Sequence, residues 1–336
     1  MRRCAMPAPS RIRRFSACHA AVVEHTMNLL PAKPYASTHA LWRRGRRREL
    51  ATAVVMLAPS LLFLCAFTYW PILRSVVYGL FDVQLGSPEI YFVGLENYVR
   101  LWHDALFWKS LRNTVVYMVV TVPTSITLAL MLAVALDRGL RGTALYRSAF
   151  FYPVMIPSVA AGMVWVFLYA PGYGPINSLM GFLGLPKLEW LYDPRWALPA
   201  IIFMSVWKYA GYFMLILLAA LQLVPRDLYE AARLDGVSGF RQLLHITVPL
   251  ISPTLYFVVV IGVLHSYQIF DYVFVMTQGG PADATNVLTF YIYQNAFQFR
   301  DIGSASAIAN ILLLVVGGLI GIVALTLGRR VHYMGR

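Results

Sequence analysis

Residues 197–222 read ALPAIIFMSVWKYAGYFMLILLAALQ, a stretch in which Lys208 is the only charged side chain. A helix needs about 20 consecutive apolar residues to cross the hydrocarbon core of a bilayer. One such run is compatible with a buried helix of a soluble protein, but six in one chain predict an all-α polytopic bundle of six transmembrane helices. The runs are residues 50–73, 113–136, 148–171, 197–222, 250–276 and 302–328.

The composition excludes an ordinary soluble domain. Of the 336 residues, 59% are hydrophobic and 13% are charged, whereas soluble domains carry about 25% charged residues. The formal net charge of +13 by itself suits a nucleic acid or an anionic ligand, but the basic residues flank the apolar runs, which is a topology signal. Cys4, Cys18 and Cys65 show neither ligand spacing nor an even-numbered framework, so no zinc site or disulfide scaffold is predicted.

The distribution of Lys and Arg predicts the orientation, because these residues are retained on the cytoplasmic side of a membrane. Residues 1–50 hold 11 of the 28, and with this segment inside, the cytoplasmic loops carry most of the others. Both termini are therefore expected in the cytoplasm. Residues 1–49 form a basic arm expected to be disordered, or an over-long translation start ahead of Met27. Residues 50–330 form the six-span domain, and residues 331–336 form a cytoplasmic tail.

The cytoplasmic loop 224–249 reads VPRDLYEAARLDGVSGFRQLLHITVP and predicts a short helix, a turn and a second helix outside the bilayer. Asp227 and Glu230 are spaced as a capping box at the start of the first helix. Gly236 is placed to end that helix in a left-handed conformation, and Ser238 is placed to cap the next one. The loop is therefore a helix-turn-helix that projects from the bundle.

The first helix of this loop carries an apolar surface with two small residues. Leu228, Ala231, Ala232 and Leu234 supply it, and small side chains permit the close approach of a partner groove. The alternative is an amphipathic helix that lies on the lipid, which the physics of this segment alone does not exclude.

The spacing of the residues in this loop favours docking of the first helix in a partner groove over a position on the lipid. Residues 230–232 (EAA), then Gly236 after three residues and residues 246–249 (ITVP) after nine more resemble the EAA loop of binding-protein-dependent ABC importers. Val248 stands where Leu is usual in that motif. Other segments resemble the maltose-type carbohydrate importer permeases, and the resemblance covers about residues 50–330. These segments are residues 92–98 (FVGLENY), 147–153 (RSAFFYP), 206–208 (VWK) and 277–281 (TQGGP).

The resemblance implies a permease subunit that moves a sugar or oligosaccharide inward by alternating access. It also implies the plasma (inner) membrane of a bacterium or archaeon, and three kinds of partner: a P-loop ATPase dimer, a second six-span permease and an extracytoplasmic solute-binding protein. The chain has no G-x-x-x-x-G-K-[ST] motif, so it is expected to be no enzyme and to hold no cofactor, with ATP bound by the ATPase subunit. The residues expected to couple to that ATPase are Glu230, Ala231, Ala232, Asp235 and Gly236.

The substrate path is expected among the fourth and fifth spans. Polar residues inside a membrane are costly and are functional candidates by default. Lys208 and His265 lie at similar depths, near the middle of the bilayer core. Each candidate has an alternative role as a hydrogen-bond partner between helices. The candidates, carried over mainly by the resemblance, are Tyr212, Lys208, Gly262, His265, Ser266 and Ile269.

Three other functions compete with sugar import. An ion-coupled secondary transporter needs paired carboxylates within its spans, and the only span carboxylate here is Asp271. A membrane enzyme built on His245, His265 or Asp271 would lack both a nucleophile–base pair and metal-ligand spacing. A permease for sn-glycerol 3-phosphate shares most of these motifs, so the sequence leaves the substrate open.

Overall fold

The computed structural model describes residues 52–137 and 142–328. The expected N-terminal arm (1–49), the tail (331–336) and both termini lie outside the described residues. The chain divides into two units, Met1–Tyr69 and Trp70–Arg336. In the first unit, residues 52–69 are helical and every side chain is exposed.

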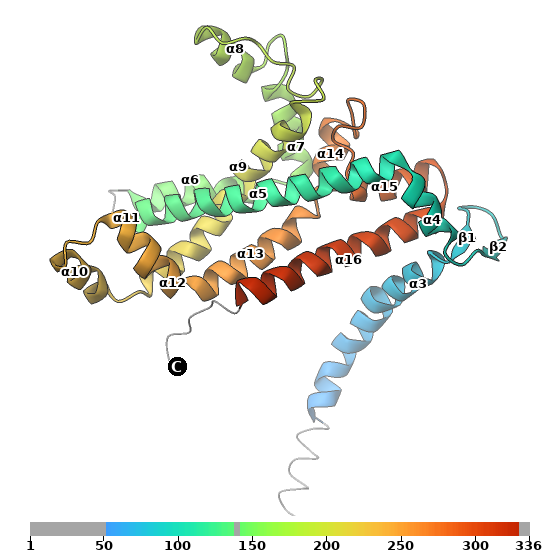
Figure 1. Cartoon of the computed structure of the whole chain (residues 1–336), viewed down its shortest axis with the longest axis horizontal. Coiled ribbons are helices and arrows are strands. Elements are labelled where there is room, and N and C mark those ends of the chain that lie inside the picture. The colour runs from blue at the N-terminus through green and yellow to red at the C-terminus, as the bar shows by residue number, and fades with distance from the viewer. Residues whose placement is uncertain (1–51, 138–141, 329–336) are drawn as a thin grey trace, which may run out of the picture. The chain divides into compact units, whose positions relative to one another are not determined.

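Within the described residues, four continuous helices are long and apolar enough to cross a membrane: Thr52–Tyr78, α5 (Ala105–Asp137), α9 (Ala197–Gln222) and α16 (Ile302–Thr326). The first of these includes a π-helical segment, η1 (Cys65–Tyr69), followed by α3 (Trp70–Tyr78). Two further spans are bent pairs of helices, which brings the total to six when each pair counts as one span. The expected all-α fold is therefore confirmed (Figure 1).

The bent pairs differ from the continuous helices that the sequence predicts. In the third span, α6 (Thr143–Met155) meets α7 (Ser158–Leu168) at 101°. Pro157 explains this break, because a proline disfavours helical geometry in the residue before it, and Ile156 is extended (φ −71°, ψ 130°). In the fifth span, Gly239–Leu250 meets α13 (Ser252–Ser266) at 78°. A further break separates α13 from α14 (Phe270–Met276), so the prediction of one helix over residues 250–276 is wrong.

The interior of the second unit is built on α5 and α9, which pack along each other. Figure 1 shows α5, α13 and α16 running side by side, and α13 contacts both of the other two. A cluster of buried side chains from α5, α9 and α13 fills the space between these helices and includes Ala129, Phe213, Leu217 and Val258. Burial of this apolar surface against neighbouring helices fixes which face of each span is turned inward.

The outer ends of the spans are connected by ordered segments, several of which contain the motifs of the sequence. Strands β1 (Phe81–Val83) and β2 (Ile90–Phe92) pair antiparallel, with Phe81 opposite Phe92. Helix α4 (Glu96–His103) follows, and its buried Asn97 donates to the carbonyl oxygens of Gly79 and Phe81, both at 3.0 Å. The Asn of the FVGLENY segment therefore has a structural role. It donates hydrogen bonds to the carbonyl of Gly79, just after α3, and to that of Phe81 in β1.

A second set of contacts holds the loop after α14. Asn113 of α5 donates to the carbonyl oxygens of Asp283 (3.1 Å) and Asn286 (2.9 Å). In α15 (Leu288–Tyr293), the Tyr291 hydroxyl donates to Asp104, and burial, with the Asp104 hydrogen bond as the second cause, raises the pKa of this phenol. η3 (Gln294–Gln298) then leads towards α16.

The segment between the third and fourth spans is organised by one buried asparagine. Asn177 of α8 (Pro175–Phe182) donates to the Leu188 carbonyl (2.9 Å) and accepts from the backbone N–H of Leu188 and the indole of Trp190. These hydrogen bonds tie α8 to the chain that enters α9.

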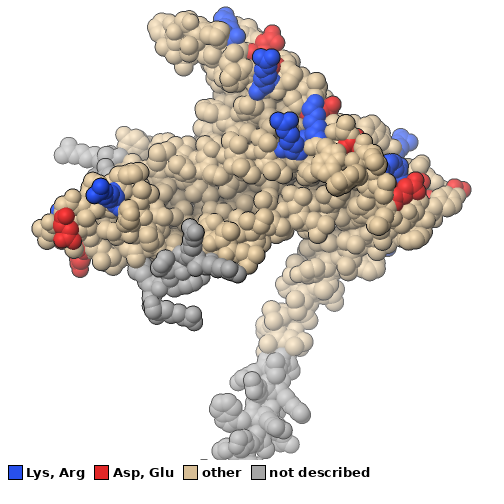
Figure 2. Space-filling model, viewed as in Figure 1, with Lys and Arg blue, Asp and Glu red and all other residues tan. Residues whose placement is uncertain are grey.

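Charged residues on the second unit are unevenly distributed. On the face shown in Figure 2, Lys, Arg, Asp and Glu gather over the α10–α11 loop (residues 226–242) and over the segments at the opposite ends of the spans. The surface of the helices between them is free of these charges in that view. Such a band is the surface that a bilayer requires.

We predict that Gly211→Ala destabilises the protein by about 1–3 kcal/mol or more. A Cβ atom at Gly211 of α9 would overlap the backbone carbonyl of Phe150 in α6, and a backbone cannot move aside as a side chain can. Thermal unfolding of the purified chain measures the effect. The matched control is Gly317→Ala in α16, where an added Cβ meets no described atom within 4 Å. Equal melting temperatures for the two variants would contradict this account of the α6–α9 crossing.

Candidate functional site

The loop 224–249 has the expected helix-turn-helix form. α10 (Arg226–Leu234) is followed by Gly236 at φ +71°, then by α11 (Gly239–Gln242), the π-helical η2 (Leu243–Thr247) and α12 (Val248–Leu250). The left-handed Gly236 is confirmed: its N–H donates to the Arg233 carbonyl, and the N–H of Val237 donates to that of Ala232. These bonds satisfy carbonyls at the end of α10.

The capping box predicted for this loop is wrong. Pro225 is the N-cap residue of α10, and the described chain shows no side-chain cap hydrogen bond there. Asp227 lies instead in the first turn, where a negative charge still favours the helix dipole. Ser238 is the N-cap of α11 as expected, although its side chain makes no cap hydrogen bond in the described structure.

Most of the expected coupling residues are exposed. Glu230, Ala231, Asp235 and Gly236 are accessible, whereas Ala232 is 6% exposed and faces the protein. The sequence predicted that the four apolar residues of α10 form one surface. They do not, because Ala232 is buried while the others are exposed. The outward apolar side chains of this loop are Leu228, Leu234 and Phe240, at 42%, 90% and 70% exposure.

Hydrogen bonds bind α10 to the start of the fifth span. The Tyr229 hydroxyl lies 3.0 Å from the Thr247 hydroxyl of η2, and Gln242 donates to the Val237 carbonyl at 2.8 Å. These contacts tie α10 to η2, which leads through α12 and Ile251 into α13. Beside this loop lies a cavity of about 1000 Å³, lined by ends of α5, α6 and α9 and by the loop itself.

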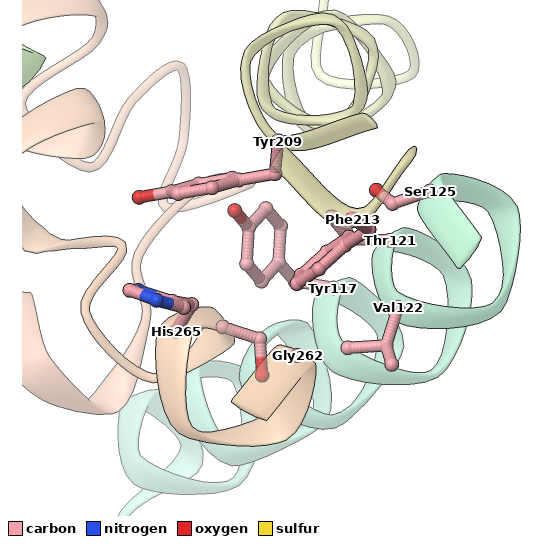
Figure 3. Close-up of a pocket in the computed structure, with 9 residues that line it drawn as sticks. Tyr117, Thr121, Val122, Ser125, Tyr209, Phe213, Gly262 and His265 are labelled. Carbon is pink, nitrogen blue, oxygen red and sulfur yellow. The ribbon is translucent and has the colours of Figure 1, made fainter. Parts of the chain in front are cut away.

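A second, central pocket lies where α5, α9 and α13 meet (Figure 3). Its volume is about 10 Å³, which is room for about one water molecule. The lining residues are Tyr117, Thr121, Val122 and Ser125 from α5, Tyr209 and Phe213 from α9, and Gly262, His265 and Ser266 from α13.

The walls of the central pocket combine aromatic rings with hydroxyl groups. The rings of Tyr209 and His265 stack at 5.2 Å, and the Tyr209 hydroxyl lies 3.1 Å from that of Tyr272. Tyr117 donates to the Ser205 hydroxyl at 2.8 Å. Among the described residues that line the pocket, none is Lys, Arg, Asp or Glu.

The structure brings together half of the expected substrate residues. Gly262, His265 and Ser266 line the central pocket, and the ring of Tyr212 meets that of His265 edge-on at 6.0 Å from just outside it. Ile269 is 1% exposed, packs in an apolar cluster with Tyr272 and is not among the described lining residues of the pocket.

Lys208 has a structural partner instead. Its side chain is buried and its ammonium group donates to the carbonyl of Ile156, the residue at which the third span breaks. Lys208 also does not appear among the described lining residues of the central pocket.

The lining residues from the second span were not among the candidates predicted from the sequence. Tyr117, Thr121 and Ser125 lie four residues apart and so share one face of α5. That spacing in an otherwise apolar run was the available signal. Tyr209 and Phe213 of α9 were also missed, because the run 197–222 is apolar on all sides and does not reveal which face is turned to α13.

We predict that Gly262 is coupled energetically to Val122. A Cβ atom built on Gly262 would lie 3.0 Å from Val122 Cγ1, so Gly262→Val overlaps that side chain and should lower the melting temperature. Combining it with Val122→Ala should restore part of the loss, with a coupling energy of about 0.5–3 kcal/mol. Thermal unfolding of both single variants and the double variant measures this, and additive effects would contradict the contact.

Comparisons with known proteins agree with this geometry. Residues 125–332 match the protein family described as "Binding-protein-dependent transport system inner membrane component". The chain is 36% identical over 268 residues to the lactose transport system permease protein LacF of Rhizobium radiobacter, covering 78% of this chain and 89% of that protein. It is 31% identical over 280 residues to the sn-glycerol-3-phosphate transport system permease protein UgpA of Agrobacterium fabrum, covering 83% and 95%.

The fold also has a counterpart among solved structures. A chain of a bacterial ABC transporter involved in the import of the acidic polysaccharide alginate superimposes with a TM-score of 0.71. The two sequences are 24% identical, and the match covers 86% of this chain and 99% of the other. At that identity the likeness supports the fold alone.

Proposed function

This chain belongs to the binding-protein-dependent transport system inner membrane components, and on that premise we propose that its cargo as an ABC importer permease is a neutral sugar or oligosaccharide. The relative named for lactose supports a sugar, while the relative named for sn-glycerol 3-phosphate makes that phosphate the main competitor. The central pocket supplies the observation that favours the sugar.

The chemistry of the pocket suits a neutral, polyhydroxylated ligand. The stacked rings of Tyr209 and His265 offer apolar faces, the hydroxyls of Thr121 and Ser125 can both donate and accept, and the Ser266 hydroxyl can accept. A phosphate group is best held by charge-assisted bonds from Arg or Lys. No such residue is present among the described lining residues, and Lys208 is already bonded to the Ile156 carbonyl.

Coupling to ATP is assigned to the exposed loop. Glu230 and Asp235 present carboxylates, while Ala231 and Gly236 allow close approach of a groove in the partner ATPase, which would bind the nucleotide. Leu228 and Leu234 supply apolar surface on the outward side. A push on this loop would reach Gly262, His265 and Ser266 through η2, α12 and α13, and would thereby alter the pocket.

The proposal includes the remaining components of an importer. A second six-span permease would complete the pathway, and an extracytoplasmic binding protein would deliver the sugar. Both termini are assigned to the cytoplasm of a bacterial or archaeal cell by the excess of basic residues at residues 1–50. Residues 50–330 would then act as one permease domain with residues 224–249 as its coupling loop.

The direct test is affinity purification of the tagged chain from its native membrane after gentle solubilisation. We expect a P-loop ATPase and a second six-span chain to co-purify, and uptake by the reconstituted complex with its binding protein to require ATP and a neutral sugar. Uptake of sn-glycerol 3-phosphate with no sugar transported would contradict the proposed cargo. A chain that purifies alone, in a detergent that keeps such complexes intact, would contradict ATP coupling.

We predict that Gly236→Val uncouples ATP hydrolysis from uptake. A left-handed conformation costs a non-glycine residue about 1–2 kcal/mol, so uptake should fall by roughly tenfold while membrane insertion persists. The matched control is Gly239→Ala, because both glycines face open space but only Gly236 has a positive φ. Uptake and ATPase rates of the reconstituted complex measure the effect. Equal uptake by the two variants would contradict the role given to this turn.

A further inference from the structure

The second span carries buried hydroxyls that the packing of the helices does not use. Thr114 shows the usual arrangement: its hydroxyl donates to the Ser110 carbonyl at 2.7 Å and accepts from the backbone N–H of Leu288 at 2.9 Å. Thr121 and Ser125 differ. They are 4% and 1% exposed, yet neither hydroxyl has a hydrogen-bond partner in the described structure.

Both residues belong to the wall of the central pocket. Thr121 and Ser125 line it and lie one helical turn apart, on the face of α5 that meets α9 and α13 (Figure 3). The Thr121 hydroxyl lies near that of Tyr117, but the two groups do not meet hydrogen-bond geometry. An unpaired hydroxyl in an apolar interior lowers stability, so two of them at one pocket indicate a purpose other than packing.

The partner that fits these groups is a hydroxyl-bearing, uncharged molecule. Each side chain can donate one hydrogen bond and accept others, which is the pattern that a sugar hydroxyl complements. Opposite them, the Ser266 hydroxyl already donates to the Val263 carbonyl at 2.7 Å and is left as an acceptor. The ring of His265 completes this wall.

The present volume of the pocket shows what must move. A space of about 10 Å³ holds a water molecule but no sugar ring, so α5 and α13 have to separate before a sugar enters. Val122 and Gly262 are in close contact between these helices. In this closed arrangement no described protein group pairs the hydroxyls of Thr121 and Ser125, and a bound sugar would pair them when the helices part.

We propose that Thr121 and Ser125 of the second span contact the transported neutral carbohydrate and determine its selection by hydrogen bonds to its hydroxyls. This inference rests on the proposed function and extends the site from the fourth and fifth spans to a third helix. A role of these two hydroxyls in binding sugar predicts a result that a purely structural role does not. Removing either hydroxyl weakens uptake, but it leaves the sugar-free protein equally stable or more stable, because an unpaired polar group has been deleted.

The experiment uses the complete importer in proteoliposomes with a panel of labelled neutral sugars and sn-glycerol 3-phosphate. The wild type first identifies the transported compound. Ser125→Ala and Thr121→Val are then compared with Thr127→Val, a control on the exposed face of the same helix. For each variant, KM, the maximal rate of uptake and the melting temperature of the sugar-free protein are measured.

We expect Ser125→Ala and Thr121→Val each to raise KM for the sugar about tenfold, with an unchanged or raised melting temperature, while Thr127→Val changes neither quantity. Unchanged KM in both pocket variants would overturn the inference and leave sugar transport standing. A lowered melting temperature together with lost uptake would overturn it in favour of a structural role. Wild-type uptake of sn-glycerol 3-phosphate alone would overturn the proposed function and this inference together.

Discussion

The hydrogen bond from Lys208 to the Ile156 carbonyl permits the bent geometry on which the rest of the bundle depends. A bilayer offers no water to backbone polar groups, so a helix that breaks at membrane depth needs protein partners for the carbonyls it frees. Pro157 breaks the third span at Ile156, and Lys208 from α9 supplies a charged donor at that point. A costly intramembrane cation is thereby explained by the backbone of its own protein, without a substrate.

Close helix approach is the other condition for this architecture. Membrane helices gain little from the hydrophobic effect against lipid tails, so their association relies on packing, for which small residues are needed. Gly211 lets α9 meet the backbone of α6, and Gly262 lets α13 meet Val122 of α5. The first contact supports the bent third span. The second lies at the edge of the central pocket, so the same kind of contact that stabilises the bundle also keeps this pocket closed.

The sequence predicted the features that depend on length and on special backbone residues. Six apolar runs identified the spans because the thickness of a bilayer sets the length of a helix, and Gly236 was identifiable because its position after α10 calls for a left-handed turn. The capping box failed because Pro225 takes the N-cap position and moves Asp227 into the first turn. A uniformly apolar run does not record which face is buried, so the lining residues Tyr209 and Phe213 from α9 could not be placed.

The error at Ile269 has a geometric cause. On one continuous helix, Gly262, Ser266 and Ile269 would follow one another on a single face. The helix instead ends at Ser266 and resumes at Phe270, and Ile269 packs in the cluster with Tyr272 and is not among the described lining residues of the central pocket. The prolines gave a local reason for the break at Pro157, but residues 267–269 contain neither proline nor glycine. This second break depends on tertiary packing and cannot be read from local sequence.

The breaks in the fifth span also determine how motion can travel through it. η2 and α12 are held to α10 by the Tyr229–Thr247 contact, and the bend at Ile251 separates this cytoplasmic part from α13. α13 ends immediately after Ser266, so the segment that carries Gly262, His265 and Ser266 is bounded by a break at each end. A short helix between two breaks can shift as a rigid body, whereas one continuous helix would have to move along its whole length. Displacement of α10 can therefore reposition one wall of the pocket against α5 while α14 keeps its outer contacts.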